Sequence, residues 1–214
     1  VRATLQHLGV EPLIELEPEG PASDLLARAG VGKRRSATEA DHALFQAITQ
    51  RRTTRTPFEA RDLPDTLQRS LADAAEGEGA ALWVMRTPQQ RTELAELIAQ
   101  ADQEQWSDPR VRRELAAWIH PNRRASRDGV PGYAIGMGDI MSSVAPIVMR
   151  TFDLGGGIAA RDRDIAVGSP MLAVIGTDSD NSIDWLVAGQ ALMRLLLLAT
   201  AQGVRASYLN QPIE

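Results

Sequence analysis

Apolar residues recur at helical spacing along much of the chain, and capping signals mark where helices begin. Thr38 precedes an apolar stripe that includes Leu44 and Ile48, and Asp41 stands three residues after the threonine. A hydroxyl at the N-cap with a carboxylate three residues later is a variant of the capping box. The pattern therefore predicts a helix that starts near residue 38 and runs into an arginine cluster at residue 51.

Other segments show the same helical signals. They predict a helix end at residues 2–8, a short helix at 24–29, and helices that begin at Leu63-Pro64-Asp65, at Thr87-Pro88 and at Asp108-Pro109. The last helix begins near Ser182 or Asp184 and continues to Gln202. It is apolar almost all round, which is typical of a core helix or a helix at an interface between lobes, and Gly203 is placed to end it.

Four short segments have the composition of strands. Residues 13–17 alternate between apolar and polar, which predicts a strand with one wet face. Residues 81–85 and 171–176 are continuously apolar, so we expect buried strands there, the second of them central and covered on both faces. Residues 204–209 predict a last short strand. Lys33-Arg34-Arg35 is expected in a basic loop.

Residues 120–168 are the least regular part of the sequence and include the run Gly155-Gly156-Gly157. A long loop within a compact domain is usually a lid, a ligand-binding loop or a loosely ordered insertion. We treat 129–160 as a lid candidate, with the insertion as an equally weighted alternative. The glycine run lacks the preceding strand of a dinucleotide fingerprint.

Composition narrows the classes of function. The chain has 214 residues, a hydrophobic fraction of 43% and a net charge of -5, which suits a core-forming domain and argues against nucleic acid as the main partner. It has no cysteine, which removes disulfides and thiolate chemistry and fits a reducing, cytoplasmic compartment. The longest strongly apolar stretch, 192–201, is too short to span a bilayer, so no membrane partner is expected.

The arginine cluster is the most informative candidate site. Arg51, Arg52 and Arg55 with Thr53 supply guanidinium and hydroxyl donors of the kind that bind phosphate. The alternative is a solvated patch that pairs with Glu59 and Asp62, and the residues alone favour that patch.

Three stretches together give the chain its resemblance. Residues 51–58, residues 128–131 and the ending 207–212 resemble the nitroreductase superfamily and, within it, the Acg family of NAD(P)H nitroreductases, a two-lobed FMN-binding branch. The resemblance implies an α+β fold with a small, mostly antiparallel sheet and helices on both faces. It implies that residues 1–35 are the tail of a preceding lobe and 36–214 an FMN-binding lobe without its final segment, so that the chain is a fragment.

The resemblance also implies a site and a reaction. The FMN phosphate would be bound by Arg51, Arg52, Thr53 and Arg55, and the flavin ring would lie against Ser207, Tyr208, Leu209 and Asn210. The reaction would pass a hydride from NAD(P)H through FMN to a nitro compound or quinone, with no catalytic side chain because the flavin carries the electrons. We expect a homodimer or a pairing of lobes within one chain.

Two other readings belong to different classes. One is a protein that binds or sequesters flavin with little turnover; the other is an interaction domain without flavin. No metal site is expected: His7, His42 and His120 are far apart in the sequence and are interpreted as structural or surface residues. Residues 161–164 alternate in charge like a solvated loop, and Ser142-Ser143 lacks the context of a nucleophile.

Overall fold

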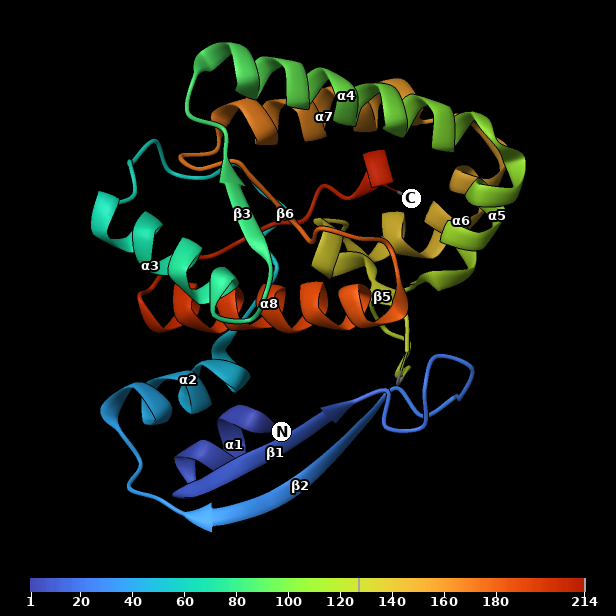
Figure 1. The fold of residues 1–214 in the computed structure, drawn as a ribbon. Coiled ribbons are helices and arrows are strands. Elements are labelled where there is room, and N and C mark those ends of the chain that lie inside the picture. The colour runs from blue at the N-terminus through green and yellow to red at the C-terminus, as the bar shows by residue number, and fades with distance from the viewer. Residues whose placement is uncertain (127, 214) are drawn as a thin grey trace. The chain divides into compact units, whose positions relative to one another are not determined.

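Helices and short strands make up the α+β structure, a computed structural model that describes residues 1–126 and 128–213 (Figure 1). Its α-helices are α1 (Arg2–His7), α2 (Glu39–Gln50), α3 (Asp65–Glu76), α4 (Pro88–Ser107), α5 (Pro109–Trp118), α6 (Asp139–Thr151), α7 (Gly155–Gly168) and α8 (Ser182–Ala201). The strands are β1 (Val10–Leu16), β2 (Ala27–Arg34), β3 (Ala81–Val84), β4 (Ile119–His120), β5 (Val130–Pro131) and β6 (Ala173–Gly176). Two 3-10 helices are η1 (Gly132–Ile135) and η2 (Gln211–Ile213).

The chain divides into two compact units, each made of segments that are distant in the sequence. Unit 1 comprises residues 1–54, 62–85 and 173–207. Unit 2 comprises residues 55–61, 86–172 and 208–214, of which the structure describes all but the last position and residue 127.

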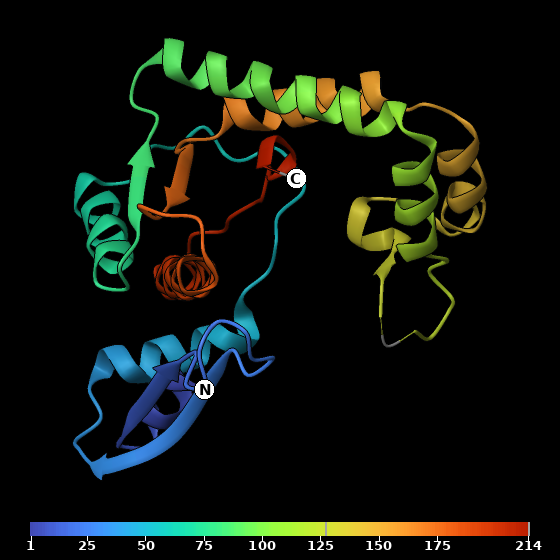
Figure 2. The same ribbon diagram turned by 45° about the vertical axis from the view of Figure 1, so that its right-hand side comes forward.

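Unit 1 is organised around α8. Leu197 on α8 packs against Leu44 and Ala47 on α2 in a buried cluster, and α3 also contacts α8. The antiparallel pair β3–β6 belongs to this unit, with Leu82 opposite Ile175. The antiparallel hairpin β1–β2 follows α1 in the chain. Helix α1 packs on α2 and on β1 (Figure 2).

Unit 2 is organised around the pair α4 and α7, which lie side by side in both ribbon views. Ile98 and Ala95 on α4 pack against Ala166 on α7. Trp106, Ala116 and Met149 form a second cluster that joins α4, α5 and α6. The parallel pair β4–β5 leads into η1 and α6.

The capping signals position the helices as the sequence predicts. Thr38 and Asp41 form a capping box at α2, and Thr87 with Gln90 forms another at α4. Asp108 caps α5, and Pro109 takes its first position. The N-cap of α8 is Asn181, one residue before the predicted range.

Several strand predictions are wrong. Residues 27–34 form β2 rather than the end of a helix and a basic loop, because backbone pairing with β1 outweighs local propensity. Residues 204–209 form a single bridge at Ala206 rather than a strand. In the described residues the strands form three two-stranded sheets, not one central sheet with helices on both faces. β6 therefore has one neighbour, and Trp83 on β3 is 50% exposed where a buried strand is predicted.

The irregular segment is largely helical, since α6 and α7 fill most of residues 139–168. The glycine run begins α7, and a Cβ at Gly155 would lie 2.9 Å from the Trp106 Cβ. Glycine is thus present for close approach of two helices, a reason that local composition does not reveal.

α8 has the length and apolarity of a membrane span, with a mean hydropathy of 1.4. Such a helix is also typical of the core of a soluble protein, and composition alone is weak support for a membrane. Within unit 1, α8 packs against α2 and α3 and supplies buried residues such as Ala191 and Leu196.

Candidate functional site

Helix α2 determines where the arginine cluster begins. Its first turn is held by the Thr38–Asp41 capping box and by an ion pair between Arg35 and Asp41, 2.7 Å apart. Its buried face packs on Leu197 of α8. The helix ends at Gln50, so Arg51 follows directly as its C-cap residue. The cluster is therefore attached to a well-packed element of unit 1.

The segment after α2 lies beside the segment after α8. Thr53 and Ala206 form a parallel β-bridge, and the Thr54 N–H donates to the Ala206 carbonyl at 2.9 Å. Residues separated by about 150 positions in the sequence are thus joined by main-chain hydrogen bonds. Thr53, Ala206 and Ser207 are half-buried there.

The guanidinium groups of the cluster differ in their contacts. Nη1 of half-buried Arg51 lies 3.5 Å from the Thr53 hydroxyl oxygen. Nη1 of exposed Arg52 donates to the carbonyls of Thr49 and Arg51, both at 2.9 Å, so this side chain helps to cap the end of α2. In the described part of the chain no ion pair involves Arg51, Arg52 or Arg55, and none joins them to Glu59 or Asp62.

The remaining predicted site residues belong to unit 2. The main-chain carbonyl of exposed Arg55 accepts a hydrogen bond from the Arg161 guanidinium. Leu209 packs against the Ala95–Ile98–Ala166 cluster, so its side chain serves the core of this unit. Tyr208 is half-buried, and Asn210 is exposed with its carbonyl accepting from the Ile213 N–H at 2.9 Å.

The C-terminal segment that follows Asn210 makes a further contact, with α7. The Gln211 side-chain amide donates to Asp162 at 3.0 Å, and η2 packs on α4. Burial raises the pKa of the Asp162 carboxyl above its usual range, while Arg161 and Gln211 act in the opposite direction. Residues 161–164 are therefore part of helix α7 with specific partners, not the solvated loop that their alternating charges predict.

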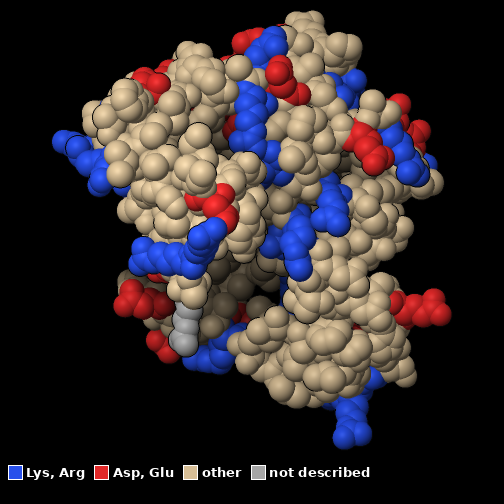
Figure 3. Space-filling view, turned by 180° about the vertical axis from the view of Figure 1, so that it is seen from behind, with Lys and Arg blue, Asp and Glu red and all other residues tan. Residues whose placement is uncertain are grey.

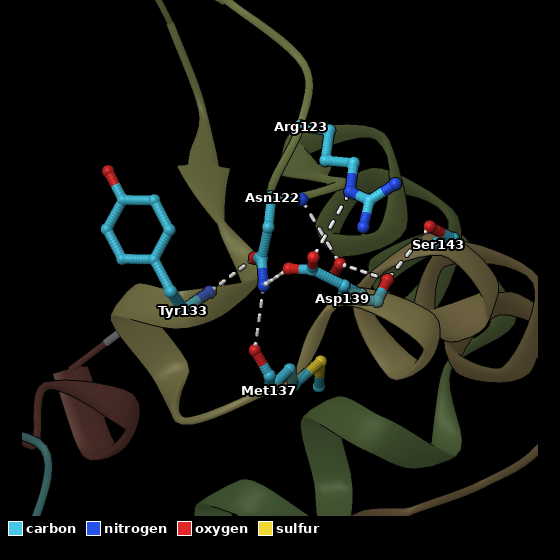
Figure 4. A network of polar contacts seen from close by, with 7 residues as sticks. Asn122, Arg123, Tyr133, Met137, Asp139 and Ser143 are labelled. Carbon is cyan, nitrogen blue, oxygen red and sulfur yellow. Dashed lines mark hydrogen bonds and ion pairs between the residues drawn. The ribbon is translucent and has the colours of Figure 1, made fainter.

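The lid candidate is anchored by one side chain that the sequence analysis did not single out. The Asn122 amide group donates to the Met137 carbonyl at 3.0 Å and to Asp139 at 3.1 Å, and its oxygen accepts the Tyr133 N–H at 2.7 Å (Figure 4). Arg123 pairs with the same Asp139 carboxylate at 3.1 Å. These hydrogen bonds, first from Asn122 and then from Arg123, lower the pKa of Asp139.

The neighbouring serines are structural. The Asn122 N–H donates to the fully buried Ser142 Oγ, which in turn donates to the Asp139 carbonyl at 2.8 Å. Ser143 donates to the same carbonyl at 3.0 Å. The segment from Gly132 to α6 is thus pinned by side-chain bonds, and a mobile flap would have to hinge outside it.

Of the three histidines, two meet although their sequence positions are remote. His7 and His42 face each other across α1 and α2 with their Nδ1 atoms 2.7 Å apart. His120 is buried, and its Nε2 lies 3.7 Å from the exposed Asp128 carboxylate. Among the residues described, no group of three or more histidine, aspartate or glutamate side chains is placed to hold a metal ion.

Most of the face in Figure 3 is formed by uncharged residues, with acidic and basic side chains projecting between them. A cavity of about 470 Å³ within unit 1 is lined by residues of α2, α3 and α8, including Leu44, Asp73 and Arg194. None of residues 51–55 lines this cavity, so it is separate from the arginine cluster.

Comparison with known proteins adds sequence relatives. No family model matches the chain. A Mycobacterium tuberculosis protein named "Putative NAD(P)H nitroreductase", present in two strains, is 30% identical over 176 residues, which are 82% of this chain and 49% of the relative. An "Uncharacterized protein" of the same organism is 29% identical over 202 residues, 92% of this chain and 56% of the relative. The chain spans about half the length of these curated relatives.

Proposed function

We propose that this chain is part of an FMN-dependent oxidoreductase of the nitroreductase type, and that the Arg51–Thr53 segment binds the FMN phosphate. The observation that supports this most strongly is the pairing of Thr53 with Ala206. It joins Thr53 to the residue that precedes Ser207, the first of the residues that the resemblance assigns to the flavin ring. The relative named "Putative NAD(P)H nitroreductase" also supports the oxidoreductase class.

The side chains at this place fit a phosphate group. Arg51 is half-buried, and its guanidinium is directed toward the Thr53 hydroxyl rather than toward a carboxylate in the described residues. Partly buried arginine and threonine donors form charge-assisted hydrogen bonds with phosphate oxygens. Ser207, next to Ala206, offers a further hydroxyl.

The other predicted contacts rest on different grounds. Arg52 already donates to two carbonyls at the end of α2, so we give it the smaller share of phosphate binding. The assignment of Arg55 to the phosphate and of Tyr208, Leu209 and Asn210 to the flavin ring rests on the resemblance. For Leu209 the contact would be made by main chain, since its side chain packs in the core of unit 2.

FMN, when bound, would accept a hydride from NAD(P)H and pass electrons to a nitro compound or quinone. The chain's own residues would bind the phosphate and orient the cofactor, and no side chain is proposed as acid or base. The alternative is a protein that binds flavin without turning it over. Mixing the flavin-loaded protein with NADPH under anaerobic conditions separates the two, because only the reductase bleaches the flavin absorbance.

The partner we propose is a second lobe, either from the other half of a longer chain or from a second copy. Unit 1 exposes large apolar side chains on α8 and on the β3–β6 pair, including Trp185 at 64% exposure, Met193 and Val174. Exposed apolar surface of this kind is typical of an interface. Light scattering should therefore show self-association of the chain, and a monomer at moderate concentration would contradict the lobe pairing.

The phosphate assignment is tested by comparing FMN with riboflavin, which lacks the phosphate. We expect Arg51→Ala to weaken FMN binding by about 1.5–3 kcal/mol, the value of a charged hydrogen bond, and to leave riboflavin binding unchanged. Arg113→Ala, at an exposed arginine of α5, is the matched control and should change neither. Equal FMN affinity of the wild type and Arg51→Ala would exclude the proposed role.

A further inference from the structure

Two histidines of unit 1 converge from separate helices. His7 is the last residue of α1, and His42 lies in the first half of α2; the two helices lie side by side in both ribbon views. Their Nδ1 atoms are 2.7 Å apart, and the ring planes are nearly perpendicular at 87°. Because each ring directs the same nitrogen at the other, the pair brings two potential metal ligands to one point.

The neighbouring aromatic residue holds one ring in place. His7 stacks on Phe45, with ring centroids 4.0 Å apart and an angle of 11° between the planes. Phe45 lies one helical turn after His42 on α2, so both the stacking partner and the second histidine come from the same helix. His42 is exposed to solvent, and a hydrated cation can therefore reach the pair.

The short contact between the two Nδ1 atoms requires a proton between them. One Nδ1 must carry a proton and donate it, while the other accepts. In the tautomer that carries this proton on Nε2 instead, both Nδ1 lone pairs point into the same space. Neutral imidazole is a good ligand for Zn²⁺, Cu²⁺ and Ni²⁺.

We propose that His7 and His42 form a two-histidine binding site for a divalent transition-metal ion, with both Nδ1 atoms as ligands and water in the other positions. With Zn–N distances of about 2.0 Å, tetrahedral ligands are about 3.3 Å apart, so a small ring rotation opens the pair enough. In the described residues no third histidine or carboxylate joins them. The site is therefore an exchangeable one, with affinity highest for Cu²⁺.

The experiment measures Cu²⁺ binding by calorimetry and by electron paramagnetic resonance, with the wild type, His7→Gln and His42→Gln. We expect one Cu²⁺ coupled to two imidazole nitrogens in the wild type. Each single substitution should reduce the affinity at least about tenfold, since loss of an outer-shell partner alone costs this much. Zn²⁺ should raise the melting temperature of the wild type only, because the ion links α1 to α2.

The matched control combines His42→Gln with Gln50→His. This variant keeps three histidines and moves one imidazole along α2 to another exposed position. We expect it to bind Cu²⁺ as weakly as His42→Gln alone, with circular dichroism confirming an intact fold. The proposal is overturned if the wild type and His42→Gln bind equally, or if the wild-type spectrum shows one nitrogen, which would leave the pair as a plain hydrogen bond. Neither result bears on FMN, which is not used.

Discussion

Removing the negative charge of Asp41 should destabilise the protein by a calculable amount. The pKa of Asp41 is lowered from 3.8 to about 2, chiefly because its carboxylate accepts the Thr38 N–H, with further contributions from the Thr38 hydroxyl and Arg35. That difference corresponds to about 2 kcal/mol of stability at neutral pH. Asp41 is 8% exposed but its ion-pair partner Arg35 is 31% exposed, so solvent screening makes about 2 kcal/mol an upper value.

The sign of the pH dependence follows from the lowered pKa. The contribution is present above the unfolded-state pKa, near 3.8, and is lost as the pH falls through the folded-state value of about 2. Asp41→Asn should therefore unfold with about 2 kcal/mol less free energy at pH 7, and its difference from the wild type should shrink toward pH 2.

Urea unfolding followed by circular dichroism at several pH values measures this difference. Asp24→Asn is the control, because Asp24 is exposed and takes part in no ion pair among the described residues. Hydrogen exchange of peptides from α2 locates the effect. A change of less than about 0.5 kcal/mol at pH 7, the usual size for a surface substitution, would contradict the stabilising role of the Asp41 carboxylate.

Three further predictions concern the segment that leads into α6. Asn122→Ala removes the hydrogen bonds to Tyr133, Met137 and Asp139 and should cost about 1–3 kcal/mol, with faster hydrogen exchange across 130–143; unchanged exchange would contradict the anchoring role. The protection factors of the same amides, which allow for slower intrinsic exchange in acid, should also fall when Asp139 is protonated, and this occurs below the usual range for an aspartate because its pKa is lowered. Gly129→Ala should destabilise by about 1–3 kcal/mol in thermal unfolding, because φ is +75° and the new Cβ would lie 2.5 Å from the Trp118 carbonyl oxygen; an unchanged melting temperature would count against this geometry.

The helices were the predictable part of the fold because their signals are local. Three helix starts are each indicated by two nearby residues, and the structure confirms all three: Thr38 with Asp41, Thr87 with Pro88, and Asp108 with Pro109. The strands depend on partners elsewhere in the chain. β2 has little strand composition of its own and forms because β1 pairs with it.

In the candidate site, too, local features could be predicted from the sequence and contacts between distant segments could not. The arginine cluster was visible in the sequence because its donors are consecutive, whereas its pairing with Ala206 is a contact between distant segments. Asn122 gave no sequence signal, since one asparagine in an irregular stretch does not reveal which carbonyls it will meet. His7 and His42 likewise lack ligand spacing and are brought together only by packing of α1 on α2.

The proposed function requires that the paired segments at Thr53 and Ala206 belong to a flavin site. The most direct measurement is the absorbance spectrum of the purified full-length protein after incubation with FMN and removal of the unbound cofactor. We expect flavin bands at one FMN per site, with weaker binding in Arg51→Ala. A colourless protein that retains no FMN would contradict it.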